Sequence, residues 1–442
     1  MLEYSLQDRT RRGVNAIGES EARDGAAAFV STNGGALAEF SGRALAFLEQ
    51  HVPRRNAEPV SAGLDFLDRP VSLFSSRDTE LDTITKAKAW RAAKYDAGFG
   101  WLSGPTQYGG GGLPAPFEAT YDQLESQFDC PDDDPFTPGL EFVGPAILQY
   151  GTDRARVGLL PAIYRGEKIC CQLFSEPDAG SDLAAIRTRA TGSNGQWVIN
   201  GQKVWTSRAH VADLGLLLAR TGTEESRHRG ITAFVLDIHA PGVTVRPLRQ
   251  MNGEEPFNQV LLDDVAISDS YRLGTIGQGW EVAMSTLTRE RSAISQSQRY
   301  RAGGLAEIAG PDRMRALAGL AGRTSDPTVR QELAGCYARH MAARWTMSRL
   351  RTVPGSHPSA VAAPGIGKLL VARQLTASAN LVARLLGPRM TAQTGTNWAD
   401  NWLPFVLGAP GPHIGGGTDE VVLNSIAERA LGLPREPRPV AK

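Results

Sequence analysis

Two short segments of the chain combine residue types that could hold a planar redox ring. Residues 175–182 (SEPDAGSD) join small hydroxyls, acids and a flexible Ala-Gly pair, and Trp205-Thr206-Ser207 follows at the end of a β-rich stretch. Such a ring requires an aromatic wall, backbone donors and hydroxyls at its polar edge, and these segments contain all three. On composition alone, the same residues also fit a turn followed by an ordinary hairpin with a core tryptophan.

The elements around these segments show the two-residue period of strands. The run QWVINGQKVWTS (residues 196–207) predicts two short strands joined as a hairpin by Asn200-Gly201. A further turn is predicted just before it at Ser193-Asn194-Gly195. More strands are expected over residues 231–238, 242–248 and 258–267. Several short strands at this spacing indicate a small antiparallel sandwich or barrel.

Helical patterns lie on both sides of this β-rich region. Before it, apolar spacing predicts helices over residues 39–51, 79–97 and 115–128. After it, Asp326-Pro327 is typical of an N-cap followed by proline at the first helical position. A second long helix is expected over residues 368–386, and a last one beginning at Thr418. The predicted order is therefore helices, a β-domain, then helices.

Composition excludes several classes of protein. Lys+Arg and Asp+Glu both number 47, so the net charge is zero and the basic footprint of a nucleic-acid binder is missing. The apolar runs are too short for a membrane span, and the N-terminus lacks the pattern of a signal peptide. The four cysteines fit neither a disulfide framework nor a CxxC metal site. We therefore expect a cytoplasmic protein without a metal, a membrane anchor or a nucleic-acid partner.

Three blocks, in this order along the chain, resemble the acyl-CoA dehydrogenase family. The first is LFSEPDAGSDL (residues 173–183) followed by NGQKVWTSRA (200–209), which is close to the flavin-binding signature of that family. The second is GQGWEVAMSTLTRER (277–291), similar to the start of the first long C-terminal helix. The third is IGGGTDEVVLNSIAERALGLPRE (414–436), similar to the C-terminal flavin and catalytic segment. Residues 1–60 are not covered by the resemblance.

The resemblance implies a multi-domain fold of α and β elements built around FAD. It consists of an N-terminal helical domain, a middle antiparallel β-barrel and a C-terminal four-helix bundle. The boundaries that we expect are a partly helical extension (1–60), the helical domain (61–165), the barrel (166–276) and the bundle (277–442). The resemblance also implies a homodimer or homotetramer, with a hetero-oligomer as the alternative.

The resemblance assigns roles to individual residues of this chain. Leu173 and Ser175 would face the flavin ring, and Trp205 and Ser207 would complete its wall and edge. Ser181 would lie near the thioester or the pantetheine arm of the acyl-CoA.

At the C-terminal end, Thr418 and Glu420 open the last helix, whose free N–H groups suit the ADP half of FAD. The arginine that reaches the FAD of a neighbouring subunit in many members has a counterpart only in Arg323. Its usual phenylalanine-glycine partners are absent here.

The reaction implied is α,β-dehydrogenation of an acyl-CoA in lipid metabolism, an oxidation of a CH–CH group. A carboxylate removes the α-proton while hydride leaves the β-carbon for flavin N5. Many members place this glutamate directly before the Gly-Thr of the third block, where this chain has Gly416. Other members place it on the first long C-terminal helix, one residue before an arginine, and Glu290-Arg291 fits that position. We therefore predict Glu290 as the base, with Arg291 holding the helix or the CoA.

The acyl group and the electron acceptor are less closely defined. The run Gly415-Gly416-Gly417 leaves space that suits a branched, aromatic or polycyclic acyl group. Electron-transfer flavoprotein is the acceptor that the resemblance implies. One alternative is an acyl-CoA oxidase or a dehydrogenase acting on a carrier-protein-bound acyl group. Another is a non-catalytic subunit that pairs with an active homologue, in which Glu290 is only structural.

Overall fold

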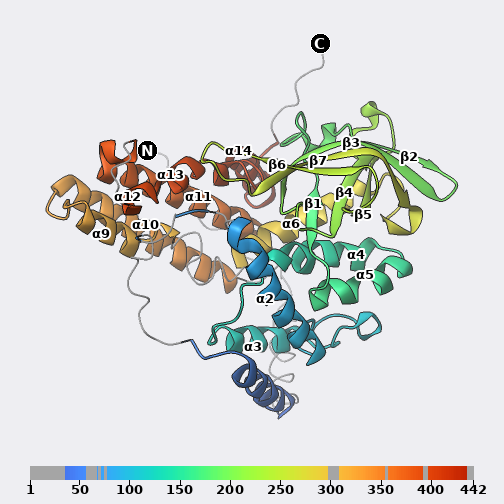
Figure 1. The fold of residues 1–442 in the computed structure, drawn as a ribbon, viewed down its shortest axis with the longest axis horizontal. Coiled ribbons are helices and arrows are strands. Elements are labelled where there is room, and N and C mark those ends of the chain that lie inside the picture. The colour runs from blue at the N-terminus through green and yellow to red at the C-terminus, as the bar shows by residue number, and fades with distance from the viewer. Residues whose placement is uncertain are drawn as a thin grey trace, which may run out of the picture.

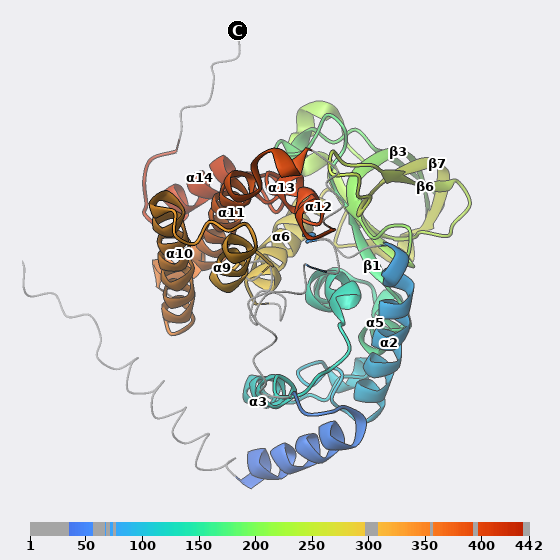
Figure 2. The same ribbon diagram turned by 60° about the vertical axis from the view of Figure 1, so that its left-hand side comes forward.

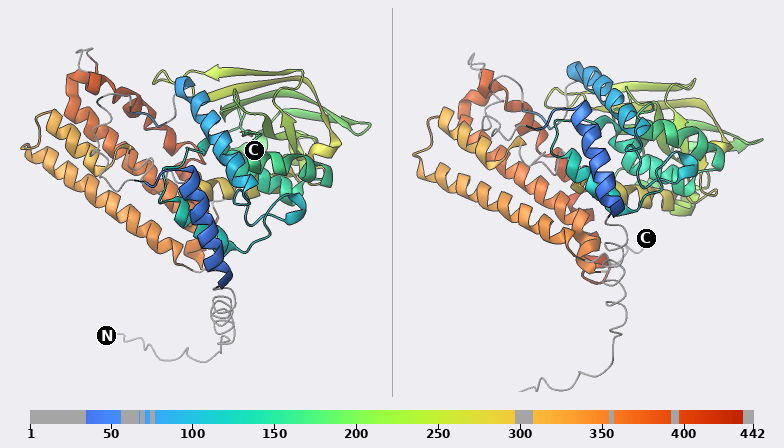
Figure 3. Two further views of the ribbon diagram at one scale, coloured as in Figure 1. Left: turned by 60° about the horizontal axis from the view of Figure 1, so that its bottom comes forward. Right: turned by 90° about the horizontal axis from the view of Figure 1, so that it is seen from below.

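The computed structural model describes residues 35–55, 67, 71–73, 77–296, 308–353, 357–391 and 397–435. These residues form N-terminal helices, a middle β-sheet domain and a C-terminal helical domain (Figure 1). The C-terminal helices lie to one side of the molecule and the sheet to the other, as Figures 2 and 3 show from further directions. The domain boundaries expected above stay a prediction, as does the four-helix arrangement of the last domain.

The first helices pack through aromatic side chains. A helix over residues 35–51 lies against α2 (Arg77–Asp96) and α3 (Ala115–Glu125). Their shared cluster contains Phe40, Phe47, Trp90, Phe117 and Tyr121. The three helices predicted in this part of the chain are thus confirmed. Residues 1–34 and 56–60 of the expected extension lie outside the described residues.

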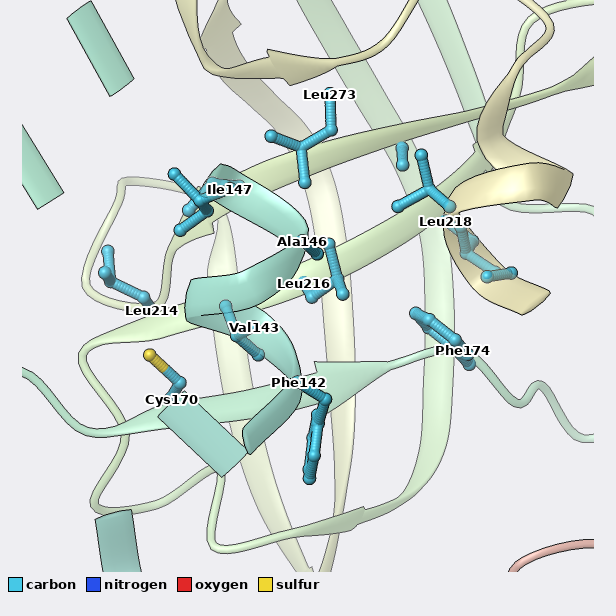
Figure 4. Close-up of a cluster of buried hydrophobic side chains, with 14 of the residues drawn as sticks. Phe142, Val143, Ala146, Ile147, Cys170, Phe174, Leu214, Leu216, Leu218 and Leu273 are labelled. Carbon is cyan, nitrogen blue, oxygen red and sulfur yellow. The ribbon is translucent and has the colours of Figure 1, made fainter. Parts of the chain in front are cut away.

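The helices beside the sheet begin with an irregular turn. The π-helical turn η4 (Gly139–Val143) runs into α4 (Gly144–Tyr150), and α5 (Asp153–Arg165) follows after the N-cap Thr152. Figure 4 shows Phe142, Val143, Ala146 and Ile147 of these helices against strand residues, among them Cys170, Leu214, Leu216 and Leu273. Burial of these side chains holds the N-terminal helices against the sheet.

The middle domain is a single sheet. Its strands are β1 (Cys170–Leu173), β2 (Arg189–Ser193), β3 (Gln196–Ser207), β4 (Leu214–Arg220), β5 (Ile231–Asp237), β6 (Val243–Leu248), β7 (Phe257–Ser268) and β8 (Arg272–Leu273). They pair in the order β6-β7-β3-β2-β4-β5-β8, and β1 pairs with β4. The order ends at β6 and β8, so the sheet of the described residues is not closed and the expected barrel is not confirmed. The strands predicted over residues 231–238, 242–248 and 258–267 correspond to β5, β6 and β7.

The hairpin predicted at Asn200-Gly201 is wrong. Strand β3 runs through both residues and pairs along its length with β7, with a shift of register between Ile199 and Gly201. A Cβ at Gly201 would lie 2.6 Å from Oγ1 of Thr188, so glycine is required there by a close approach and not by a turn. The hairpin lies at the earlier turn, where Asn194 and Gly195 both have positive φ and join β2 to β3.

The described residues of the C-terminal domain include the helices α6 (Gly279–Gln296), α9 (Pro311–Leu320), α10 (Pro327–Arg351), α11 (Pro358–Leu386), α12 (Asn397–Asp400), α13 (Leu403–Gly408) and α14 (Asp419–Arg429). Asp326 caps α10 as predicted, accepting hydrogen bonds from the backbone N–H groups of Thr328 and Val329. Helix α11 starts at Pro358, ten residues before the expected start at Lys368, and contains Pro364. No helix among the described residues is both long and apolar enough to cross a membrane.

All three regions meet at α6. This helix contacts β4 and β5 of the sheet, η4 and α4 of the N-terminal helices, and α11 of the C-terminal domain. At its start, a Cβ on Gly279 would come within 2.6 Å of the Thr232 carbonyl carbon. Only glycine lets α6 lie this close to β5. The first turn of α6 is therefore held directly against β5.

Candidate functional site

The structure brings the two segments of the first sequence block together. The backbone N–H of Val204 donates to the carbonyl oxygen of Ser175 at 2.9 Å, which joins the end of β1 to the end of β3. Trp205 is 60% exposed, although it belongs to a strand whose inward residues are buried. Ser207 is exposed and Ser175 half-buried, whereas Leu173 is fully buried. An exposed indole and two hydroxyls therefore lie on neighbouring segments.

A buried ion pair fixes these segments to each other. Lys203 is 0% exposed, and its Nζ atom lies 2.8 Å from Oε1 of Glu176 and 3.0 Å from the carbonyl oxygen of Phe174. Glu176 also accepts hydrogen bonds from the backbone N–H groups of Arg187 (2.6 Å) and Thr188 (2.9 Å). Glu176, directly after the half-buried Ser175, is thereby connected to Lys203, two residues before the exposed Trp205.

Burial acts on the pKa values of Lys203 and Glu176 in opposite directions. Burial lowers the pKa of Lys203 to about 8, although Glu176 acts against this shift. Burial would raise the pKa of Glu176, but the Lys203 cation and the backbone donors outweigh it and hold that pKa below its ordinary value. This pair was not among the residues predicted from the sequence. The available signal was a lysine at an inward-facing position of an alternating strand.

Glu290 lies near the C-terminal end of α6, the helix that all three regions share. Its side chain is half-buried and its Oε2 atom is buried. Thr286 and Leu287, one turn earlier on the same face, are respectively buried and packed against the main hydrophobic core. The carboxylate thus lies on the face of α6 that packs against the rest of the protein. The side chain of Arg291 lies outside the described residues.

The glycine run before α14 is held at both ends. Nζ of Lys368, on α11, lies 3.0 Å from the carbonyl oxygen of His413 and 2.5 Å from Oδ1 of Asp419. Nδ1 of His413 lies 2.8 Å from Oδ2 of Asp419, and its Nε2 lies 2.7 Å from Oγ1 of Thr376. Burial acts to raise the pKa of Asp419, but hydrogen bonds from Lys368 and His413 hold it below its ordinary value. We call these four residues the α11 clamp.

The remaining predicted residues take other positions. Thr418 caps α14 by accepting from the backbone N–H of Val421, and Glu420 is exposed in the first turn. Ser181 is exposed in the segment after β1. Arg323 lies 2.6 Å from Asp326 and contributes to the start of α10. None of these contacts tests a role in cofactor or substrate binding, which stays a prediction.

Comparison with known proteins identifies the family. Residues 171–265 match the model of the acyl-CoA dehydrogenase middle domain, and residues 277–431 match that of the C-terminal domain. The acyl-CoA dehydrogenase IpdE1 of Mycobacterium tuberculosis is 35% identical over 364 residues, which cover 81% of this chain and 90% of that protein. The chain belongs to the acyl-CoA dehydrogenase family.

Solved structures agree on the fold of this acyl-CoA dehydrogenase. The Tcur3481-Tcur3483 steroid ACAD has a TM-score of 0.61 at 23% identity, covering 91% of this chain and 98% of that chain. The ChsE4-ChsE5 complex from Mycobacterium tuberculosis also has a TM-score of 0.61, at 24% identity, covering 82% of this chain and 100% of that chain. The predicted family, flavoprotein class and oxidoreductase activity are thus confirmed.

The cofactor of this acyl-CoA dehydrogenase is FAD, and the described residues fit it. The exposed Trp205 provides the aromatic surface, and Ser175 and Ser207 provide hydroxyls beside it. Next to them, Oγ1 of Thr206 is buried without a hydrogen-bond partner among the described residues. Because residues alternate along β3, this hydroxyl faces the protein interior and not the side of Trp205 and Ser207, so the fit to FAD rests on the exposed indole and the two serines.

The α11 clamp allows a direct test. Lys368→Met removes the cation that connects both ends of the glycine run, and hydrogen bonds to charged groups are worth about 1.5–3 kcal/mol. We expect the free energy of unfolding to fall by about 2 kcal/mol and the KM for acyl-CoA to rise by about tenfold. Arg384→Met is the control, because it removes a partly exposed pair with Glu332 from the same helix. Equal effects of the two variants on KM would show that the clamp does not act on the site.

Proposed function

We propose that this chain dehydrogenates the α,β-bond of an acyl-CoA thioester, with Glu290 as the base that takes the α-proton. The observation that supports Glu290 is its place on the inward face of α6 with a buried carboxylate oxygen. The position that holds the base in many members is Gly416, which has no proton acceptor. When bound, FAD supplies the acceptor for the hydride that leaves the β-carbon.

Other residues of this chain bind the cofactor and the substrate. Ser175, Trp205 and Ser207 hold the flavin ring, whereas Leu173, at 0% exposure, packs in the core behind them. Thr418, Glu420 and Arg323 hold the ADP half. Ser181 and Arg291 bind the acyl-CoA. Helix α6 packs on three regions, which places the backbone of Glu290 relative to the sheet and the N-terminal helices.

We assign a bulky acyl group, branched or ring-bearing, to this site. The glycine run leaves residues 415–417 without side chains, and the atom nearest to a Cβ on Gly415 is the carbonyl oxygen of Gly411 at 3.7 Å. A similar structure is named as a steroid ACAD, which supports a polycyclic substrate class.

An anaerobic titration with a panel of acyl-CoAs tests this function. Flavin absorbance is followed with straight-chain, branched, aromatic and polycyclic thioesters of matched purity. We expect the ring-bearing thioesters to bleach the flavin with a kcat/KM at least about tenfold above that of straight chains, because each apolar group that fits its pocket is worth about tenfold or more. Faster bleaching by straight chains would contradict the assignment of a bulky substrate.

The electron acceptor that we propose is electron-transfer flavoprotein, and the assembly a homodimer or homotetramer. One structural neighbour is described as a complex of two proteins, which supports a hetero-oligomer with a homologous subunit as the second candidate. Rapid reaction with oxygen would indicate an oxidase. Bound FAD that no thioester bleaches would indicate a carrier-bound substrate or a non-catalytic subunit.

A further inference from the structure

The end of β3 that carries Trp205 and Ser207, together with the turn that begins at Arg208, has an uncommon backbone. Trp205 has a φ of 61° and Arg208 a φ of 57°, so two bulky residues adopt the left-handed region on either side of Thr206-Ser207. The register between β3 and β7 also shifts between Lys203 and Thr206. Such backbone persists only where surrounding contacts determine it. Those contacts are polar and buried, and they reach the N-terminal helices.

Asn258, on β7, holds the carbonyl oxygen at the centre of this turn. It is 0% exposed, and its Nδ2 atom donates to the carbonyl oxygen of Thr206 at 3.0 Å. Its Oδ1 atom accepts from Nη2 of Arg77 at 2.9 Å. A carbonyl only accepts and a guanidinium only donates, so the orientation of the Asn258 amide is determined.

This orientation also determines the tautomer of His210. Nδ1 of His210 lies 3.3 Å from the Asn258 amide nitrogen, so Nδ1 must accept. The ring proton is then on Nε2, which donates to Oε2 of Glu80 at 2.7 Å. The imidazole therefore links the amide of Asn258 to the carboxylate of Glu80 on α2.

Charged residues complete the network on the side of the N-terminal helices. Arg208 donates from Nε to Oε1 of Glu80 (3.2 Å) and from Nη2 to Oδ2 of Asp134 (2.6 Å). Arg77 also donates from Nε to the carbonyl oxygen of Glu255 at 2.8 Å. Burial would raise the pKa of Glu80, but His210 and Arg208 hold it below its ordinary value. The carboxylate of Glu80 thus stays available as the acceptor for both residues.

We propose that Asn258, oriented by Arg77 and by the His210–Glu80 pair, is the positioning residue for the flavin wall formed by Trp205 and Ser207. This inference rests on the proposed place of those two residues beside the flavin. Through Asn258, helix α2 of the N-terminal region is connected to the turn that contacts the cofactor. A change on α2 at Arg77 or Glu80 therefore alters FAD binding without contacting FAD.

Asn258→Asp is the isosteric test. It replaces the donor on the Thr206 carbonyl oxygen with a second acceptor, which repels that oxygen and releases the turn. We expect the apo-protein to bind FAD about tenfold more weakly than wild type, with a changed visible absorption band of the bound flavin. The control is Thr232→Val, which removes buried hydrogen bonds to Thr221 and Gly277 from β5, away from the turn. An Asn258→Asp protein that binds FAD as Thr232→Val does would overturn the proposal.

Variants of His210 provide an independent test that does not alter Asn258. His210→Asn can keep an acceptor for the Asn258 amide, whereas His210→Leu cannot. We expect FAD affinity within about threefold of wild type for the first and about tenfold weaker for the second. Equal affinities would contradict the role of Asn258. Trp205→Ala separates this inference from the proposed site. If that change leaves FAD affinity and the flavin spectrum unaltered, Trp205 does not lie beside the flavin and the proposed site is wrong.

Discussion

Glu290→Gln is expected to slow the reduction of bound flavin by acyl-CoA by about 10³-fold, while the protein keeps its FAD. A general base in position contributes about 10²–10⁴-fold, and an amide of the same shape cannot take the α-proton. The measurement is an anaerobic single-turnover experiment that follows flavin absorbance. The ratio of flavin to protein absorbance must match that of wild type, so that a lost cofactor is not mistaken for lost chemistry.

Glu281→Gln is the matched control on the same helix. Glu281 lies in the first turn of α6, is exposed, and accepts from Tyr150 (3.2 Å) and Gln278 (2.9 Å). We expect this variant to reduce its flavin within about twofold of the wild-type rate, because a solvated carboxylate is not on the reaction path. Bleaching by Glu290→Gln at the wild-type rate would place the base elsewhere. The clamp residue His413 would then be the next side chain to test.

Much of the fold follows from local patterns, because helix caps and strand alternation act over a few residues. Asp326 and Thr418 cap α10 and α14 as expected, and β5, β6 and β7 occupy the predicted runs. The error at Asn200-Gly201 has a non-local cause. A dipeptide that favours a hairpin was incorporated into β3 because pairing with β7 continues on both sides of it.

The polar contacts of the site could not be predicted, because their partners are distant in sequence. Glu80 and His210 are 130 residues apart, and Lys368 and Asp419 are 51 apart. No short-range pattern connects such pairs. The family resemblance did lead to the Ser175 and Trp205 segments, which the Val204–Ser175 hydrogen bond joins. It did not lead to the ion pair that holds them, although the inward position of Lys203 was visible in its strand.

That ion pair gives the second prediction of large effect: Lys203→Met is expected to destabilise the protein by about 3–5 kcal/mol, because it leaves the Glu176 carboxylate buried without its cation. The double variant Lys203→Met/Glu176→Gln removes both charges and is expected to recover part of this loss. Urea unfolding, followed by fluorescence and by flavin absorbance, measures the loss of stability in the single variant and the recovery in the double variant. Lys168→Met is the control, since its pair with Asp213 is partly exposed and worth about 1 kcal/mol or less.

The two signals in that experiment separate stability from function. Glu176 follows Ser175, and Lys203 precedes Val204-Trp205, so loss of the pair loosens both segments proposed to contact FAD. We therefore expect Lys203→Met to release flavin at a urea concentration below that of global unfolding, whereas Lys168→Met loses both signals together. In the double variant we expect flavin release and global unfolding to occur at closer urea concentrations, because no unpaired charge is then buried between the two segments. If the two signals coincide in Lys203→Met, the pair stabilises the fold without positioning the flavin segments.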